Sequence, residues 1–178
     1  MTSQPDELLT LSVSNLKGGA AKTVSSVALA ESMARAEAKV LLVDLDPQGT
    51  ASQWLSNRSD AATKLLTGDF DPGEDISAVF TSEPPPDELK HDIFGRNRVG
   101  RVDMVTADRS LEDATERRAS DLSRRLEKLW RGAEDGYDIA VVDTPPQAGR
   151  LVTAALLATA SVVVPVAAGR GAVDDTDD

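Results

Sequence analysis

Cysteine is absent from the 178 residues, and aromatic side chains make up only 3% of them. Without cysteine the chain can form no disulfide and can offer no thiolate to zinc or to an iron–sulfur cluster. The scarcity of aromatic residues leaves Leu, Val, Ile and Ala to build the core. No apolar run approaches the roughly 20 residues that a membrane-spanning helix needs.

Basic residues are also few, since 19 Lys and Arg face 30 Asp and Glu, which leaves a net charge of −11. Such a charge opposes non-specific binding to nucleic acid, although a local basic patch could still bind it. The length suits one domain, residues 1–178. Met1–Glu7 is polar and lacks the layout of a signal peptide, so we expect a cytoplasmic protein without a membrane partner.

Short apolar runs alternate with helix-length amphipathic segments along the chain. Five runs predict strands at Leu8–Val13, Val40–Val43, Val102–Val105, Ile139–Val142 and Ser161–Val166. Helices are predicted at 22–36, 50–57, 60–67, 74–81, 109–131 and 148–159. This order predicts an α/β fold in three layers, with a mainly parallel sheet flanked by helices.

The predicted helix at 109–131 carries an apolar stripe and a basic one. Its inward positions are expected to be Leu111, Ala114, Leu122, Leu126 and Leu129. Arg117, Arg124, Lys128 and Arg131 would share another face. Acidic residues are interspersed among them, which favours a solvated face with ion pairs over a nucleic-acid patch. Trp54 and Trp130 are expected to pack in the interior.

A small-residue loop, Asn15-Leu16-Lys17-Gly18-Gly19-Ala20-Ala21-Lys22-Thr23, connects the first strand to the first helix. Unpaired N–H groups and the helix dipole favour an anion at such a point. Lys22 would add a charge for the β- and γ-phosphates, and the Thr23 hydroxyl would bind Mg²⁺. Ala21 stands where glycine is common, at a cost of about 1 kcal/mol if φ is positive there and little if φ is negative.

Carboxylates end the second and fourth predicted strands. Asp44-Leu45-Asp46-Pro47-Gln48-Gly49 follows the second strand, and Asp143-Thr144-Pro145-Pro146 follows the fourth. Ligands of open α/β sheets sit at the carboxyl ends of the strands. Side chains alternate along a strand, so Asp44 and Asp46 would share a face and order Mg²⁺ and the attacking water. Asp143 would hold Mg²⁺ through water.

The first loop matches K-G-G-x-x-K-T, and with V-D-x-D-P-Q-G and the Asp143 strand it resembles the ParA/MinD group of P-loop ATPases. The acidic end, Val173–Asp178, does not resemble the membrane helix of MinD. Iron-protein relatives of nitrogenase need cysteines, so the ParA partition branch is favoured. The resemblance implies a Mg·ATP-dependent ATPase of plasmid or chromosome partition. Its nucleotide-binding residues would be Lys17, Gly18, Gly19, Ala20, Ala21, Lys22, Thr23 and Val24.

Further roles follow from this resemblance alone. Lys17 would reach the nucleotide of the second subunit in an ATP-dependent homodimer, much as an arginine finger does. Asp46 would position or polarise the water, and Asp44 would support either the Mg²⁺ site or a switch. Together Lys17, Lys22 and Asp46 would be catalytic, and Thr23, Asp44 and Asp143 would serve the metal. A ParB-like centromere-binding protein would be the partner.

The chain stops where members of that group normally continue with further strands and helices. Three interpretations stay open: a natural short variant, a fragment of a longer gene, or a degenerate remnant, of which we favour the last two. DNA binding is therefore not carried over from the family. The alternative function is a nucleotide-binding or interaction module that does not hydrolyse ATP.

Overall fold

A five-stranded parallel sheet forms the centre of the computed structural model, which describes residues 8–55, 61–67 and 102–166. The strand order is β3-β2-β4-β1-β5, and every neighbouring pair is parallel. The strands are β1 (Leu9–Val13), β2 (Val40–Asp44), β3 (Val102–Val105), β4 (Ile139–Asp143) and β5 (Ser161–Val163). The predicted fold class is confirmed.

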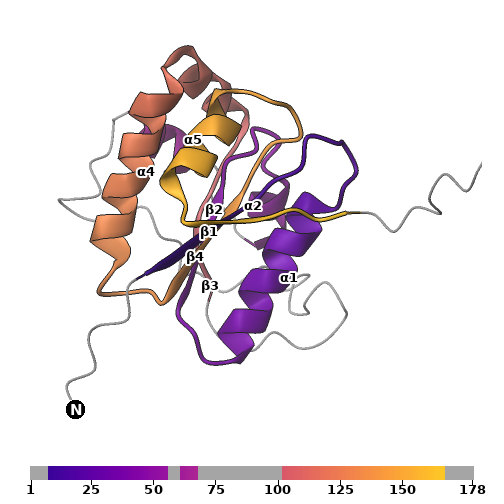
Figure 1. The fold of residues 1–178 in the computed structure, drawn as a ribbon, viewed down its shortest axis with the longest axis vertical. Helices are drawn as coiled ribbons and strands as arrows, with labels where there is room; N and C mark the ends of the chain where they lie inside the picture. The colour runs from indigo at the N-terminus through magenta and orange to yellow at the C-terminus, as the bar shows by residue number, and fades with distance from the viewer. Residues whose placement is uncertain (1–7, 56–60, 68–101, 167–178) are drawn as a thin grey trace, which may run out of the picture.

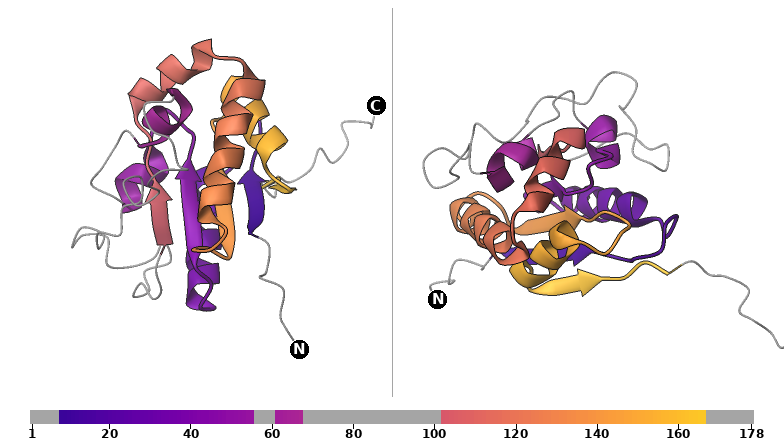
Figure 2. Two further views of the ribbon diagram at one scale, coloured as in Figure 1. Left: turned by 90° about the vertical axis from the view of Figure 1, so that its left-hand side faces the viewer. Right: turned by 90° about the horizontal axis from the view of Figure 1, so that it is seen from above.

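Helices cover both faces of the sheet (Figure 2). They are α1 (Lys22–Arg35), α2 (Thr50–Leu55), α3 (Ala61–Thr67), a 3₁₀ segment η3 (Arg109–Glu116), α4 (Ala119–Ala133) and α5 (Arg150–Ala158). Because side chains alternate along β2, Val40 and Leu42 pack with α1 and α2, whereas Leu41 and Val43 pack with α3, η3, α4 and α5. Figure 1 shows α4 and α5 side by side, on the other side of the sheet from α1.

Strands β2 and β4 are buried at every position, which explains why their sequences are continuous apolar runs. Each run ends in a fully buried aspartate, Asp44 in β2 and Asp143 in β4. The register pairs these two residues with each other, and it pairs Val13 of β1 with Asp143. The carboxyl ends of β1, β2 and β4 therefore meet at one edge of the sheet.

The prediction of a single helix at 109–131 is wrong. The structure has η3 and α4, separated by Arg117 and Arg118 in extended conformation. Leu111 and Ala114 are three residues apart, the period of a 3₁₀ turn. A continuous α-helix would turn position 118, four residues after Ala114, toward the core. The break leaves Arg118 exposed.

The other predicted elements agree with the structure to within a few residues. The predicted strand at 161–166 ends at Val163, and the helix predicted at 148–159 begins at Arg150. The five predicted inward positions of the 109–131 segment are all fully buried. Trp130 is 7% exposed, and its Nε1 donates a hydrogen bond to the Ala158 carbonyl. The helix predicted at 74–81 lies outside the described residues.

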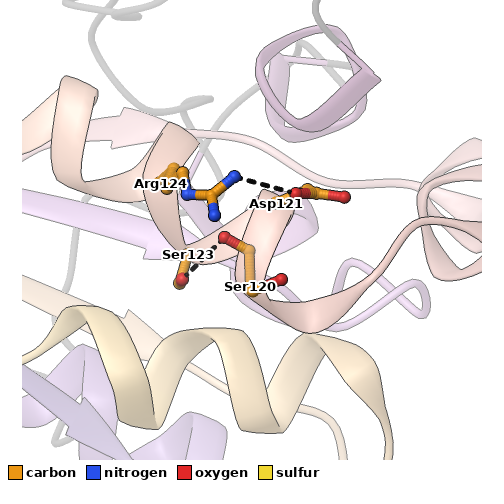
Figure 3. A network of polar contacts seen from close by, with 4 residues as sticks. All are labelled: Ser120, Asp121, Ser123 and Arg124. Carbon is orange, nitrogen blue, oxygen red and sulfur yellow. Dashed lines mark hydrogen bonds and ion pairs between the residues drawn. The ribbon is translucent and has the colours of Figure 1, made fainter.

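The charged face of α4 carries the predicted mixture of signs. Arg124 donates a hydrogen bond to Asp121 at 3.1 Å, and the Ser123 hydroxyl donates to the Ser120 carbonyl (Figure 3). Arg117 lies outside the helix and so does not share its face.

Within residues 8–55, 61–67 and 102–166, no helix is both long enough and apolar enough to cross a membrane.

Candidate functional site

The loop between β1 and α1 is held at its start by the segment that follows β5. The Ser14 N–H donates to the Val163 carbonyl at 3.0 Å, and Asn15 Nδ2 donates to the Pro165 carbonyl at 2.8 Å. Asn15 Oδ1 in turn accepts the Lys17 N–H at 2.8 Å. Leu16 to Gly19 are exposed beyond this anchor. The loop thus leaves the sheet at a fixed point and turns its middle toward solvent.

Two residues of the loop have left-handed backbone conformations. Gly19 has φ +72°, which glycine adopts freely. Ala21, which immediately precedes α1, has φ +57° and ψ 29°. The costlier of the two alternatives for Ala21 is therefore the one found, at about 1 kcal/mol. No side chain caps the start of α1, so its first N–H groups and the helix dipole can serve an anion.

The first turns of α1 bring a lysine and two hydroxyl groups to the end of β4. Lys22 is only 7% exposed, with its Nζ 3.5 Å from the Lys17 carbonyl oxygen. The Ser26 hydroxyl donates to Asp143 Oδ1 at 2.9 Å, and Thr23 also forms a hydrogen bond to this carboxylate. Ser26 was not among the predicted site residues. In the sequence, the only indication of a role for Ser26 is its position one helical turn after Lys22, on the same face of the helix.

The two carboxylate oxygens of Asp143 differ. Oδ1 accepts the hydrogen bond from Ser26, whereas Oδ2 is buried and has no hydrogen-bond partner among the described residues. Burial, with a smaller contribution from the Asp46 charge, raises the pKa of Asp143 to about 6, although the Thr23 and Ser26 hydrogen bonds and Lys22 act against this rise. An unpaired buried carboxylate oxygen is costly unless a cation or a proton meets it. Asp143 thus fits the predicted Mg²⁺ site.

The donor set around Asp143 suits a cation that keeps its own water. No group of three or more His, Cys, Asp or Glu side chains that could enclose a metal occurs within residues 8–55, 61–67 and 102–166. Mg²⁺ typically takes one or two carboxylates, substrate phosphates and several waters. The Thr23 hydroxyl and the Asp143 carboxylate meet that requirement.

Asp44 is arranged differently from Asp143, because both of its oxygens already accept hydrogen bonds. Oδ1 accepts the Asp46 N–H at 2.9 Å, and Oδ2 accepts the Ser52 N–H at 3.0 Å and the Ser52 hydroxyl at 2.7 Å. Burial, followed by the nearby Asp143 charge, raises the pKa of Asp44 to about 7. Both predicted roles of Asp44, support of the Mg²⁺ site and support of a switch, stay predictions.

Asp46 lies at the surface of a cavity of about 580 Å³ between that loop, η3 and the start of α5. Its Oδ1 accepts the Gln48 N–H at 2.9 Å, and the side chain is 9% exposed. The cavity is also lined by Glu112, Thr115 and Pro145. A carboxylate at a solvent-filled cavity can orient a water molecule, as predicted for Asp46.

The structure brings together most of the predicted residues. Thr23 is hydrogen-bonded to Asp143, and the charge of Lys22 acts on the same carboxylate. Asp44 and Asp46 lie at the end of the adjacent strand. Lys17 and Gly18 are exposed, and Val24 is 41% exposed on the first turn of α1.

A family model described as an AAA domain (AAA_31) matches residues 9–175, nearly the whole chain. The chain belongs to this family. The chain is 33% identical over 156 residues to the chromosome partitioning protein ParA of Myxococcus xanthus, and this match covers 86% of this chain and 50% of that protein. It is 32% identical over 158 residues to the sporulation initiation inhibitor protein Soj of Bacillus subtilis, and this match covers 88% of this chain and 57% of that protein.

The fold of this AAA domain is also found in solved structures. Cobyrinic acid a,c-diamide synthase from Mycobacterium smegmatis, solved with a bound ATP analogue and magnesium, is similar with a TM-score of 0.70 and 28% identity. That similarity covers 93% of this chain and 64% of the other. The predicted resemblance to the ParA family is confirmed. The chain spans about half the length of the curated relatives it matches.

Proposed function

We propose that this AAA domain binds Mg·ATP between the loop Asn15–Thr23 and the carboxyl ends of β2 and β4, and hydrolyses it as a switch in DNA segregation. The observation that carries the proposal is the contact of α1 with β4. There Thr23 and Ser26 form hydrogen bonds to the carboxylate of Asp143, and Lys22 is buried nearby. The Oδ2 atom of this carboxylate is buried without a hydrogen-bond partner in the described part of the chain. The partition proteins among its relatives support the biological role.

Each residue has a defined task in this proposal. The N–H groups of residues 18–23 and the Lys22 ammonium bind the phosphates and balance the charge that develops during transfer. Thr23 and Asp143 would hold Mg²⁺, which when bound neutralises charge on the phosphate oxygens. Asp46 orients and polarises the attacking water from the wall of the cavity.

Two parts of the proposal concern a second molecule. Lys17 is exposed on the loop, where it can serve the nucleotide of a second subunit in an ATP-dependent homodimer. A ParB-like DNA-binding protein is the proposed partner that stimulates hydrolysis. Both rest on the likeness to the ParA family.

Binding and turnover of Mg·ATP by the purified chain test this function. We expect saturable binding by calorimetry and a slow release of phosphate. Lys22→Ala should reduce the affinity at least about tenfold. Lys39→Ala is the matched control, because Lys39 is exposed at the amino end of β2 and forms its hydrogen bond to Asp138 through the backbone.

The outcomes separate the candidate functions. Binding without turnover, even with DNA and a ParB-like protein present, would leave a nucleotide-binding module that does not hydrolyse ATP. Turnover that survives Lys22→Ala would contradict the proposed site. No binding at all would refute the proposal.

A further inference from the structure

The loop that carries Asp46 is fastened to a part of the chain more than 50 residues away, the junction between β3 and η3. Two contacts make the connection, and both meet Ala107. The Ala107 N–H donates to the Ser52 hydroxyl oxygen at 2.8 Å. On the same residue, the Ala107 carbonyl oxygen lies against the backbone of Gly49.

Ser52 connects Ala107 to Asp44 through its hydroxyl group. Its hydroxyl accepts from Ala107 and at the same time donates to Asp44 Oδ2 at 2.7 Å. The other oxygen of Asp44 accepts the Asp46 N–H at 2.9 Å. A continuous series of hydrogen bonds therefore runs from Ala107 through Ser52 and Asp44 to the backbone of Asp46. Ser52 is 2% exposed, so water competes little with these bonds.

Gly49 fixes the other side of the loop. Its φ is +60°, and a Cβ placed on it would overlap the Ala107 carbonyl oxygen. Any side chain would push the loop away from the junction or distort both. The Gly49 N–H also donates to the Asp46 carbonyl at 2.8 Å, so the position of Gly49 is transmitted to Asp46. The close approach explains why glycine stands at this position.

The junction leads directly into the wall that faces Asp46. Asp108, the next residue, accepts the Ser110 N–H at 3.0 Å and starts η3. Through Glu112 and Thr115, η3 lines the same cavity as Asp46. The contacts of Ala107 therefore fix the position of the Asp46 loop relative to η3 on the other side of the cavity.

We propose that Ser52 is a positioning residue for hydrolysis, which acts by joining Asp44 to the Ala107 backbone and so holds the Asp46 carboxylate at the cavity. This inference rests on the proposed ATPase function. It assigns a role to a residue that is not part of the cavity lining and whose hydroxyl bonds to Asp44 and Ala107.

Steady-state hydrolysis and ATP binding by Ser52→Ala and Ser52→Thr test it. We expect Ser52→Ala to lower kcat about 10- to 100-fold with little change in KM or ATP affinity, because misplacing a catalytic group affects the reaction and not phosphate binding. Ser52→Thr keeps the hydroxyl and should retain most of kcat. Ser123→Ala, which removes another buried serine hydroxyl (Figure 3), should change neither constant.

Gly49→Ala tests the same connection from its other side. It should lower kcat as Ser52→Ala does, and the double variant should lose much less than the product of the two single losses, because both break one connection. Thermal unfolding of each variant separates a local effect from failure to fold.

Several outcomes would overturn the inference. They are an unchanged kcat in Ser52→Ala, an equal loss in Ser52→Thr, a parallel loss of ATP affinity, or multiplicative effects in the double variant. If the wild-type chain binds ATP but shows no turnover, the proposed function fails and this inference fails with it. That result is seen before any variant is made.

Discussion

Replacing Asp143 by asparagine should stabilise the free protein while weakening its response to Mg·ATP. Asp143 is fully buried and its Oδ2 has no hydrogen-bond partner. Burial raises the pKa of its carboxyl from 3.8 to about 6. At one pKa unit per 1.36 kcal/mol, this difference of about two units corresponds to a cost of about 3 kcal/mol when the group is ionised.

The sign of the pH dependence follows from the direction of this shift. The folded protein holds the Asp143 proton more tightly than the unfolded chain, so the contribution of Asp143 to stability falls as pH rises above 3.8 and levels off above about 6. Asp143→Asn keeps an oxygen to accept the Ser26 hydrogen bond but cannot ionise. The gain in unfolding free energy should therefore be below about 1 kcal/mol at pH 4 and reach about 3 kcal/mol at pH 8.

Urea denaturation of the nucleotide-free protein at the two pH values measures the gain. Adding Mg·ATP should then raise the melting temperature of the wild type more than that of Asp143→Asn. Asp121→Asn is the control, since this exposed carboxylate pairs with Arg124 on the surface of α4. A variant that is less stable than the wild type at pH 8, or that responds fully to Mg·ATP, would refute the reasoning.

Three further substitutions, the first with a matched control, test the packing and the loop by urea denaturation. Ala21→Gly should raise the unfolding free energy by up to about 1 kcal/mol, because alanine is strained at φ +57°; Ala36→Gly, at φ −85°, should lower it. Leu126→Ala empties a fully buried position of α4 and should cost about 2–5 kcal/mol, whereas no loss would contradict the described core. Trp130→Phe leaves the Ala158 carbonyl without its donor and should cost about 1–3 kcal/mol; a neutral result would mean that water replaces the indole.

The strands and the fold class could be predicted because buried parallel strands leave an unmistakable pattern of consecutive apolar residues. Val40–Val43 and Ile139–Val142 are such runs, and both lie in the centre of the sheet. The break between η3 and α4 could not be predicted from periodicity. Leu111, Ala114 and Leu122 fit a helical stripe, and the break is seen only in the structure, in the extended backbone of Arg117 and Arg118.

The site could be predicted as a set of residues but not as a set of contacts. Lys22, Thr23 and Asp143 stand in recognisable motifs, whereas Ser26 and Ser52 are ordinary helical serines in the sequence. Their roles depend on the register that pairs Asp44 with Asp143 and on the approach of Ala107 to Gly49. The contacts of Asp44 were likewise hidden in the sequence: one of its oxygens accepts from Asp46 in the loop after β2, and the other accepts from Ser52 of α2.

The most direct test of the central claim is ATP binding and phosphate release by Asp46→Asn. Asparagine keeps an oxygen for the Gln48 N–H but cannot polarise water as a carboxylate does. We predict that Mg·ATP affinity is retained while hydrolysis falls at least about 100-fold. Asp135→Asn, on an exposed residue between α4 and β4, should behave as the wild type. Hydrolysis at the wild-type rate in Asp46→Asn would contradict the proposed hydrolytic site.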